Sequence, residues 1–287
     1  MVRKARAHGG VGGRGLGMEL RRHRERTGLS LEKVGAVLGW SANTMSRLER
    51  GLRPDTTPDE VSALLAVMGV VGADRERVMR MAFGLVEQGW WETNNANMSD
   101  QARTYLGFES RASRIVDVEP LLVPGLLQTP EYMHALFIAF GVNKSEIPGR
   151  IARRVRRQQL LDRWEPPALV FVVSELALHQ PVGGDAVMAR QLRHMAEQAR
   201  RPHVSVRLIP VSVAAHPALR GAYVVLDFAD EQPVVFIEGR RSGMFPDDPE
   251  EVAEYRQAAE KVADLTLSEE GSRDLLLAIA EGMERAR

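Results

Sequence analysis

The sequence contains no cysteine, which excludes a disulfide framework and any zinc site with thiolate ligands. This absence fits a reducing compartment, and we expect the chain to be cytoplasmic. Long apolar runs are missing too, because the longest, around residues 61–73, is short and interrupted. We therefore predict no membrane-spanning segment. The N-terminus is basic but has no apolar stretch, so we expect no signal peptide.

Net charge is also absent, because 38 basic residues balance 38 acidic ones, but the two signs are unevenly distributed. Residues 1–68 carry twelve basic and seven acidic side chains, an excess of five positive charges. The rest of the chain carries the matching negative excess. A basic head on an acidic body favours contact between the head and a polyanion, although a solvated basic surface has the same composition.

With 287 residues, the chain is long for a single domain. We predict short helices at residues 16–26, 31–38, 42–50, 58–68 and 75–88. The fourth has a clear start, because Thr57 can cap it, Pro58 suits its first position and Glu60 completes a capping box. A polar, asparagine-rich connection follows residue 89. We therefore predict a flexible basic arm at 1–14, a first domain at 15–70, a helical connector at 71–99 and a second domain at 100–287.

The second domain is expected to mix helices and strands. Helices are predicted at residues 99–114, after 129, and at 146–164, 185–199, 249–265 and 268–285. Strands are predicted at 168–175, 204–210, 221–228 and 233–239, and the last two are expected to form a hairpin. Residues 118–128 are expected to be extended and broken by proline. We place four aromatic or apolar side chains on the inner face of the helix after residue 129: Tyr132, Leu136, Phe137 and Phe140.

Residues 31–51, LEKVGAVLGWSANTMSRLERG, read as one helix with an interruption in the middle. Two helices that cross steeply need a small residue where they touch and a residue that tolerates positive φ in the turn. Gly35 and Gly39 meet these needs, and Ser41 suits the cap of the second helix. The apolar residues form one inward seam: Val34, Leu38, Trp40, Met45 and Leu48. The pattern predicts a helix-turn-helix, although a plain helical hairpin has a similar outline.

Residues 16–54, LGMELRRHRERTGLSLEKVGAVLGWSANTMSRLERGLRP, resemble the Xre/Cro, lambda-repressor-like DNA-binding domain. His23 departs from that pattern, because its inward position is commonly aliphatic, but it can pack there as a neutral imidazole. Later motifs resemble a large class of actinobacterial antitoxin-like transcriptional regulators: GWW at 89–91, VPGLLQTPEY at 123–132, RVRRQQLL at 154–161, and HVSVRLIP followed by GAYVVLDF. The resemblance covers nearly the whole chain and includes a C-terminal domain of poorly defined activity.

This resemblance implies an α+β chain in which an all-α, lambda-repressor-like helix-turn-helix head precedes a mixed helix and strand regulatory domain. The implied partners are double-stranded DNA, a second copy of the chain in a homodimer, and a small acidic protein encoded nearby. The head would read a near-palindromic site, one half-site for each copy. The second domain would then receive a signal or a partner.

The outward face of the second helix of the predicted motif, residues 42–50, is expected to read DNA. Asn43 can pair with adenine and Arg47 with guanine, each through two hydrogen bonds. Phosphate contacts, short base contacts or bracing positions are expected for the other candidates: Ser41, Ala42, Thr44, Ser46, Arg50, Arg53, Arg21 and Arg24. The arm at residues 1–14 either adds contacts of this kind or is a disordered tail.

Several other patterns have two interpretations. The glycine-rich residues 9–17 lack the Gly-Lys-Ser/Thr ending of a phosphate loop, which favours a flexible arm. The predicted basic helix is either a solvated face or a second nucleic-acid surface, and we favour the solvated face. Its six arginines are Arg150, Arg153, Arg154, Arg156, Arg157 and Arg163. Five aromatic residues either pack in the core or line a ligand pocket, and we favour core packing: Trp90, Trp91, Tyr132, Phe137 and Phe140. Glu175 and Arg157 are candidates for a structural ion pair.

No motif of a nucleophile or of a zinc protease is present. Five residues that resemble metal ligands lack compact ligand spacing: His179, His203, His216, Glu175 and Glu238. We therefore expect no enzymatic activity, no cofactor and no metal. Two alternatives stay open beside the regulator. One is a small-molecule sensor or enzyme domain at residues 100–287 that the head targets to DNA, and the other is an antitoxin that acts only through protein contacts.

Overall fold

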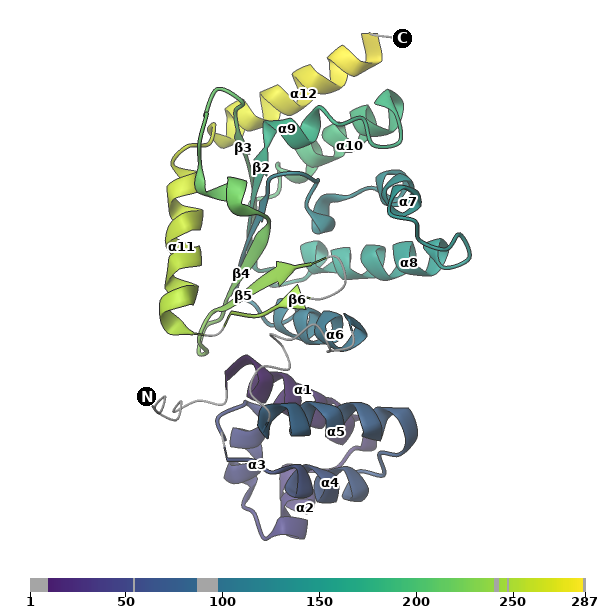
Figure 1. The fold of residues 1–287 in the computed structure, drawn as a ribbon, viewed down its shortest axis with the longest axis vertical. Coiled ribbons are helices and arrows are strands. Elements are labelled where there is room, and N and C mark those ends of the chain that lie inside the picture. Colours follow the sequence, from purple (N-terminus) through teal and green to yellow (C-terminus); the bar gives the residue numbers. More distant parts are fainter. Residues whose placement is uncertain (1–9, 54, 87–97, 240–242, 247, 286–287) are drawn as a thin grey trace. The chain divides into compact units, whose positions relative to one another are not determined.

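The computed structural model describes residues 10–53, 55–86, 98–239, 243–246 and 248–285 (Figure 1). The chain divides into two compact units. The first comprises residues 1–108 with 238–247, and the second comprises residues 109–237 with 248–287. The α+β class is confirmed, because a helical head precedes a domain that combines helices with a six-stranded mixed sheet.

Short helices packed around one apolar core make up the head. Its elements are α1 (Gly10–Thr27), α2 (Leu31–Gly35), η1 (Ala36–Leu38), α3 (Ala42–Glu49), α4 (Pro58–Val67) and α5 (Gly72–Val86), and α6 (Met98–Glu109) follows. The helix α4 begins as predicted, since Thr57 caps it and Glu60 completes the capping box. Fully buried side chains from all five head helices form the core, among them Leu20, Val34 and Leu64.

The helix α1 begins earlier than we predicted. It starts at Gly10, so the predicted flexible arm is wrong for residues 10–14, while residues 1–9 lie outside the described part. The glycines of this segment allow close packing. A Cβ atom on Gly17 would lie 2.5 Å from the carbonyl oxygen of Leu48, and one on Gly51 would lie 2.6 Å from the backbone of Arg14. Gly17 and Gly51 therefore serve contact between α1 and the end of α3, although we expected the glycine-rich residues 9–17 to be flexible.

A twisted mixed sheet organises the second unit. The strand order is β3-β2-β1-β4-β5-β6. The strands are β1 (Arg114–Glu119), β2 (Ala168–Ser174), β3 (Val204–Ile209), β4 (Tyr223–Asp227), β5 (Val234–Glu238) and β6 (Gly243–Met244). The first three are parallel, with Val116 opposite Val170. The strand β4 is antiparallel to both β1 and β5, with Val225 opposite Val235, which confirms the predicted hairpin.

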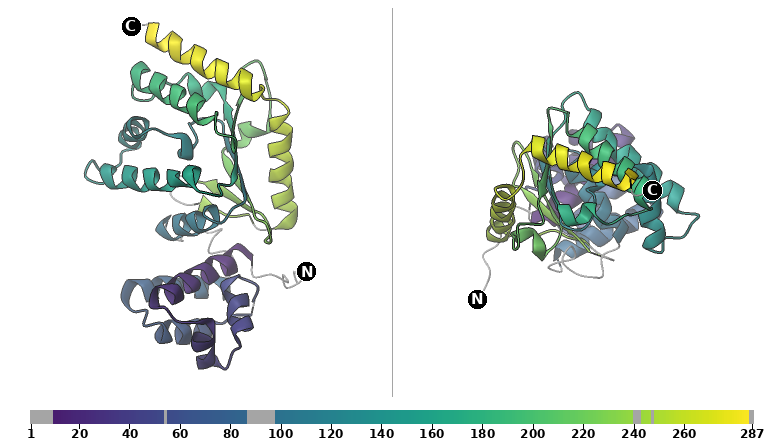
Figure 2. Two further views of the ribbon diagram at one scale, coloured as in Figure 1. Left: turned by 180° about the vertical axis from the view of Figure 1, so that it is seen from behind. Right: turned by 90° about the horizontal axis from the view of Figure 1, so that it is seen from above.

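Helices cover both faces of this sheet (Figures 1 and 2). The helix α11 (Pro249–Ala263) packs on one face through residues such as Val252 and Val262. The opposite side carries the helices α7 (Pro130–Ala139), α8 (Ile147–Gln158) and α10 (Asp185–Gln198). The short 3-10 turns η2 (Gly125–Leu127) and η3 (Gln159–Asp162) pack against α8, and the one-turn helix α9 (Glu175–Leu178) follows β2 directly. A short turn η4 (Pro217–Arg220) precedes β4, and α12 (Glu269–Arg285) packs against α10.

Two glutamine side chains, one from α10 and one from α8, hold the loop between β1 and α7. Gln191 of α10 accepts a hydrogen bond from the Thr129 amide and donates one to the Leu127 carbonyl, both at 2.7 Å. Gln158 at the end of α8 donates to the carbonyl of Gln128, also at 2.7 Å. Because Gln191 is fully buried, these bonds satisfy an amide that would otherwise be costly to bury. The irregular loop is thereby fixed to both helices.

Three features differ from the sequence predictions: the strand β1, the end of the helix that precedes it and the position of Phe140. We did not predict β1, because the buried Asp117 interrupts its apolar pattern, and the helix that we extended to residue 114 ends at Glu109. On α7, Tyr132, Leu136 and Phe137 are buried as predicted, but Phe140 is 60% exposed. Phe140 follows the last residue of the helix, so its side chain leaves the inner face. Trp90 and Trp91 lie outside the described residues.

No described helix has the length and apolar character that crossing a bilayer requires.

Candidate nucleic-acid interface

The interruption in residues 31–51 is a turn between two capped helices. The hydroxyl of Ser30 caps α2, and α2 continues into the 3-10 turn η1. Gly39 ends this turn with φ +66°, a left-handed conformation that L side chains rarely adopt. The hydroxyl of Ser41 then accepts a hydrogen bond from the Thr44 amide at 3.2 Å and starts α3. The predicted roles of Gly39 and Ser41 are confirmed.

Gly35 is the predicted point of close approach between α2 and the following segment. A Cβ atom at this position would lie 2.8 Å from Cγ of Met45 and 2.8 Å from the carbonyl oxygen of Trp40. Of the inward seam, Val34, Met45 and Leu48 are fully buried. Leu38 and Trp40 are partly buried and pack against the same core. The close approach and the buried seam predicted for a helix-turn-helix are therefore present.

The outward face of α3 carries the residues that we expect to read DNA. Asn43, Arg47 and Arg50 are exposed, Ser41 is exposed at the cap, and Ala42, Thr44 and Ser46 are half-buried. Asn43 and Arg47 are four residues apart, which places them on the same face of the helix. Within the described residues, the side chains of Asn43 and Arg50 have no hydrogen-bond partner, whereas Arg47 donates to the Leu52 carbonyl at 3.3 Å.

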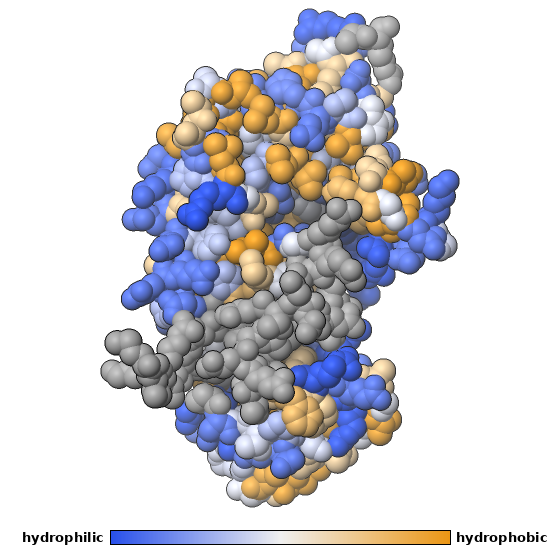
Figure 3. Space-filling model, viewed as in Figure 1, coloured by the Kyte–Doolittle hydropathy of each residue, from blue (hydrophilic) through white to orange (hydrophobic). Residues whose placement is uncertain are grey.

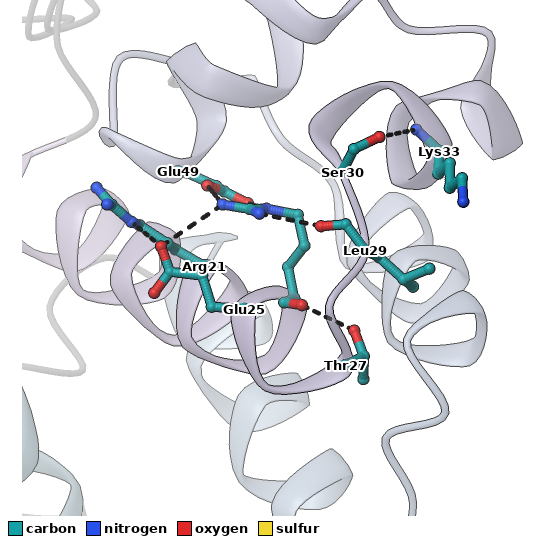
Figure 4. Close-up of polar contacts among 8 residues, drawn as sticks. Arg21, Glu25, Thr27, Leu29, Ser30, Lys33 and Glu49 are labelled. Carbon is teal, nitrogen blue, oxygen red and sulfur yellow. Dashed lines mark hydrogen bonds and ion pairs between the residues drawn. The ribbon is translucent and has the colours of Figure 1, made fainter.

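Arg24 has a structural partner that the sequence did not reveal. Its Nε and Nη2 atoms donate to the two carboxylate oxygens of Glu49 at 2.6 and 2.9 Å, and Nη1 donates to the carbonyl of Leu29 at 3.1 Å. Figure 4 labels the two acceptor residues, Glu49 and Leu29. Glu49, the last residue of α3, is buried. The hydrogen bond to Glu49 raises the pKa of Arg24 above its usual range. This pair fixes the C-terminal end of α3 to α1.

Arg21 and Arg53 complete the set of predicted contact residues. Arg21 is exposed on α1 and pairs with Glu25 at 2.7 Å, one turn along the helix. The guanidinium of Arg53 lies 3.8 Å from the ring centroid of Trp40 and donates to Glu60 at 2.9 Å. We expected Arg24 and Arg53 to contact DNA, but the structure gives both guanidinium groups partners within the head. Sequence separations of up to 25 residues hid these pairs.

His23 packs inside the head as a neutral imidazole. It is fully buried, and its Nδ1 lies 3.1 Å from Nη2 of Arg26, from which it can only accept a hydrogen bond. Burial lowers its pKa below the usual range, and the charge of Arg22 acts in the same direction. The carboxylates of Glu19 and Asp74 oppose this shift. The tolerance that we predicted for histidine at this position thus has a physical basis.

The basic helix of the second unit is α8, and most of its arginines have partners. Arg157 forms two hydrogen bonds of 2.6 Å with the buried Glu109, so the ion pair that we considered between Arg157 and Glu175 is wrong. The carboxylate of Glu175 instead accepts from the Val211 amide at 2.8 Å. Glu146 is the partner of Arg150, and Gln128 is the partner of Arg154. The helix ends at Gln158, earlier than the predicted residue 164, so Arg163 lies beyond it and donates to the Ser110 carbonyl. Arg153 and Arg156 are exposed.

An apolar groove of about 690 Å³ lies between α7 and α8. Its lining includes Ile138, Ile147, Ile151 and Val155, with His134 and Lys144 as polar members. An adjoining hollow of about 760 Å³ shares Ile138 and Ile151 and extends to the start of α10. Ile138 is 49% exposed and Val155 is 42% exposed. Figure 3 shows apolar residues gathered over α7, so this face of the second unit is open and largely apolar.

Among the described residues, no group of three or more His, Cys, Asp or Glu side chains is placed to hold a metal ion.

The head and its site define a helix-turn-helix DNA-binding protein, and a family model described as "Helix-turn-helix domain" matches residues 16–78. A second model, described as "Domain of unknown function (DUF5753)", matches residues 102–278. Since this match covers more than half of the chain, the protein belongs to the DUF5753 family. No curated protein and no solved structure matches the chain.

Proposed function

We propose that the chain is a sequence-specific transcriptional regulator that reads double-stranded DNA through α3. One observation carries the proposal: Asn43 and Arg47 stand exposed on one face of a short helix whose two ends are held by the caps and ion pair described above. Each can recognise a base by two hydrogen bonds, adenine for Asn43 and guanine for Arg47. Ser41, Thr44, Ser46, Arg50 and Arg21 are then available to position the helix on the backbone.

The experiment that tests this function compares binding of the full chain to its own upstream DNA and to a scrambled fragment over a range of salt concentrations. An Arg47→Ala variant should bind the upstream DNA roughly 5-fold to 150-fold less tightly, because one bidentate base contact is worth about 1–3 kcal/mol. Arg22→Ala is the matched control, since it removes the same charge from an exposed position on α1. Absent or salt-independent binding by the unaltered chain would refute the proposal.

A homodimer is the assembly that this function favours, because one head contacts only a half-site of near-palindromic DNA. As a regulator of the antitoxin-like, Xre-type class that the motifs resemble, the chain would act in the cytoplasm and would bind a small acidic protein encoded nearby. We assign it no catalytic activity. Sedimentation of the full chain with and without DNA tests the dimer, and a monomer on the complete operator would exclude it.

We further propose that the second unit receives the signal, and the apolar groove between α7 and α8 favours a small apolar ligand or partner there. Thermal unfolding of the full chain against a panel of metabolites tests this proposal, because a ligand that binds the folded state raises the melting temperature. An Ile151→Glu variant places a charge in the groove lining and should abolish the shift. A shift that survives in this variant would place the ligand elsewhere.

A further inference from the structure

Arg53 lies in the connection between α3 and α4, yet its guanidinium contacts the residue just before α3. The Cζ atom is 3.8 Å from the ring centroid of Trp40, well within the distance of a cation–π contact. Trp40 immediately precedes Ser41, the cap of α3. A single side chain therefore joins the segment that enters α3 to the segment that leaves it.

The same guanidinium is also anchored at the start of α4. Its Nη2 donates to Oε1 of Glu60 at 2.9 Å, while Oε2 of the same carboxylate accepts from the Thr57 amide at 2.8 Å. Asp55 lies 3.5 Å from Nε. Glu60 thus closes the capping box of α4 and holds Arg53 at once. The position of the Arg53 guanidinium is fixed by a helix end and by an aromatic face.

These contacts leave the Arg53 guanidinium little accessible surface with which to contact DNA. Its side chain is only 18% exposed, and its Nη1 atom is buried. Nη1 has no hydrogen-bond partner among the described residues, but because it is buried, contact with a phosphate would require the guanidinium to shift from its place beside Trp40 and Glu60. Arginine suits the observed role better than lysine, because a planar guanidinium can stack on a ring while its edge donates hydrogen bonds.

We propose that Arg53 is a positioning residue that fixes the N-terminal end of α3 against α4 through Trp40 and Glu60, and that it does not contact DNA. This inference rests on the proposed function of α3. Asn43 is the base-reading candidate nearest to Trp40, so loss of the clamp should first weaken recognition by Asn43. The clamp complements the pair of Arg24 and Glu49, which holds the opposite end of α3.

The experiment uses the full-length chain, its upstream DNA and a scrambled fragment of equal length. Arg53→Lys keeps the positive charge but cannot stack and donate as a plane, so binding to the upstream DNA should weaken roughly 2-fold to 30-fold. Binding to the scrambled fragment and the salt dependence should stay unchanged. The matched control is Arg50→Gln, which removes an exposed candidate for phosphate contact and should reduce the slope of log K against log salt by about 0.9.

A Trp40→Leu variant adds a test of the coupling. If the two side chains act together, the double variant of Trp40→Leu and Arg53→Lys should bind no more weakly than the weaker single variant. Two results together would identify a phosphate contact and overturn the proposal. Arg53→Lys would bind the upstream DNA like the unaltered chain, and Arg53→Gln would have a shallower slope of log K against log salt. Equal losses on both fragments together with loss of folded protein would also overturn it, because they indicate only lost stability.

Failure of the proposed function would look different. In that case the unaltered chain would not distinguish the two DNA fragments at all. Hydrogen exchange of the α3 amides then decides the positioning role on its own, since faster exchange near Ser41 in Arg53→Lys supports the clamp. Unchanged exchange there overturns it.

Discussion

The buried pair of Arg24 and Glu49 offers a direct test of how α3 is held. A Glu49→Ala substitution leaves the Arg24 guanidinium without its main partner in a site where the Arg24 side chain is only 13% exposed. Removing one member of a buried ion pair costs about 3–5 kcal/mol, because the remaining charge stays desolvated. Arg24 keeps its bond to the Leu29 carbonyl and lies 3.8 Å from Glu25, so we expect the lower end, about 3 kcal/mol.

This loss is a large part of the stability of a small domain, which is about 5–15 kcal/mol in total. It can be measured by urea titration of the full-length chain, followed through hydrogen exchange of the α3 amides. Glu25→Ala is the control: this carboxylate pairs with Arg21 and also lies 3.8 Å from Arg24, but it is 53% exposed, so its removal should cost about 0.5 kcal/mol or less. A loss of less than about 1 kcal/mol for Glu49→Ala would refute the reasoning.

A second arm of the experiment separates charge burial from packing. The double variant of Arg24→Met and Glu49→Leu removes both charges and keeps similar volume, so it should recover most of the lost stability. If it is as unstable as Glu49→Ala, the loss comes from packing or from the Leu29 contact.

Two further predictions concern the head. Gly35→Ala should destabilise the head by about 1–3 kcal/mol, because the added methyl group would lie 2.8 Å from Met45 and from the carbonyl of Trp40. Equal denaturation midpoints for the variant and the unaltered chain would contradict the close approach. Because burial, and then Arg22, lowers the pKa of His23, the unfolded state takes up a proton more readily, so the free energy of unfolding should fall as pH drops below 6.5. In His23→Leu, the free energy of unfolding should fall less between pH 7 and pH 5. Some fall should remain, because the pKa values of His194 and His216 are also lowered. An unchanged pH dependence in His23→Leu would contradict a neutral buried imidazole.

Features that depend on neighbouring residues could be predicted from the sequence. The turn at Gly39, the cap at Ser41 and the capping box of Thr57 and Glu60 each involve residues at most three positions apart. The steric reasons for these residues are local, so the pattern alone was sufficient to locate the helix-turn-helix. The hairpin of β4 and β5 was predictable for the same reason.

Features that depend on distant residues could not be predicted. Arg24 and Glu49 are 25 residues apart, and Arg157 and Glu109 are 48 apart, so no periodicity indicates which charges meet. The strand β1 was missed because its central Asp117 resembles a break in an apolar run, although the sheet buries it. The glycine-rich start of α1 predicted flexibility, because the close contact of Gly17 with the end of α3 is a property of the folded head.

The glutamine side chains around the loop before α7 have a consequence for binding in the second unit. Gln158 belongs to α8 and Gln191 to α10, and both hold the backbone that leads into α7. The three helices that line the groove and its adjoining hollow are therefore joined through one loop. The groove would therefore be preorganised before a molecule binds, so little of the binding free energy would be lost to ordering the protein. Replacing Gln191 by leucine would then weaken binding in the groove without changing any residue of its lining.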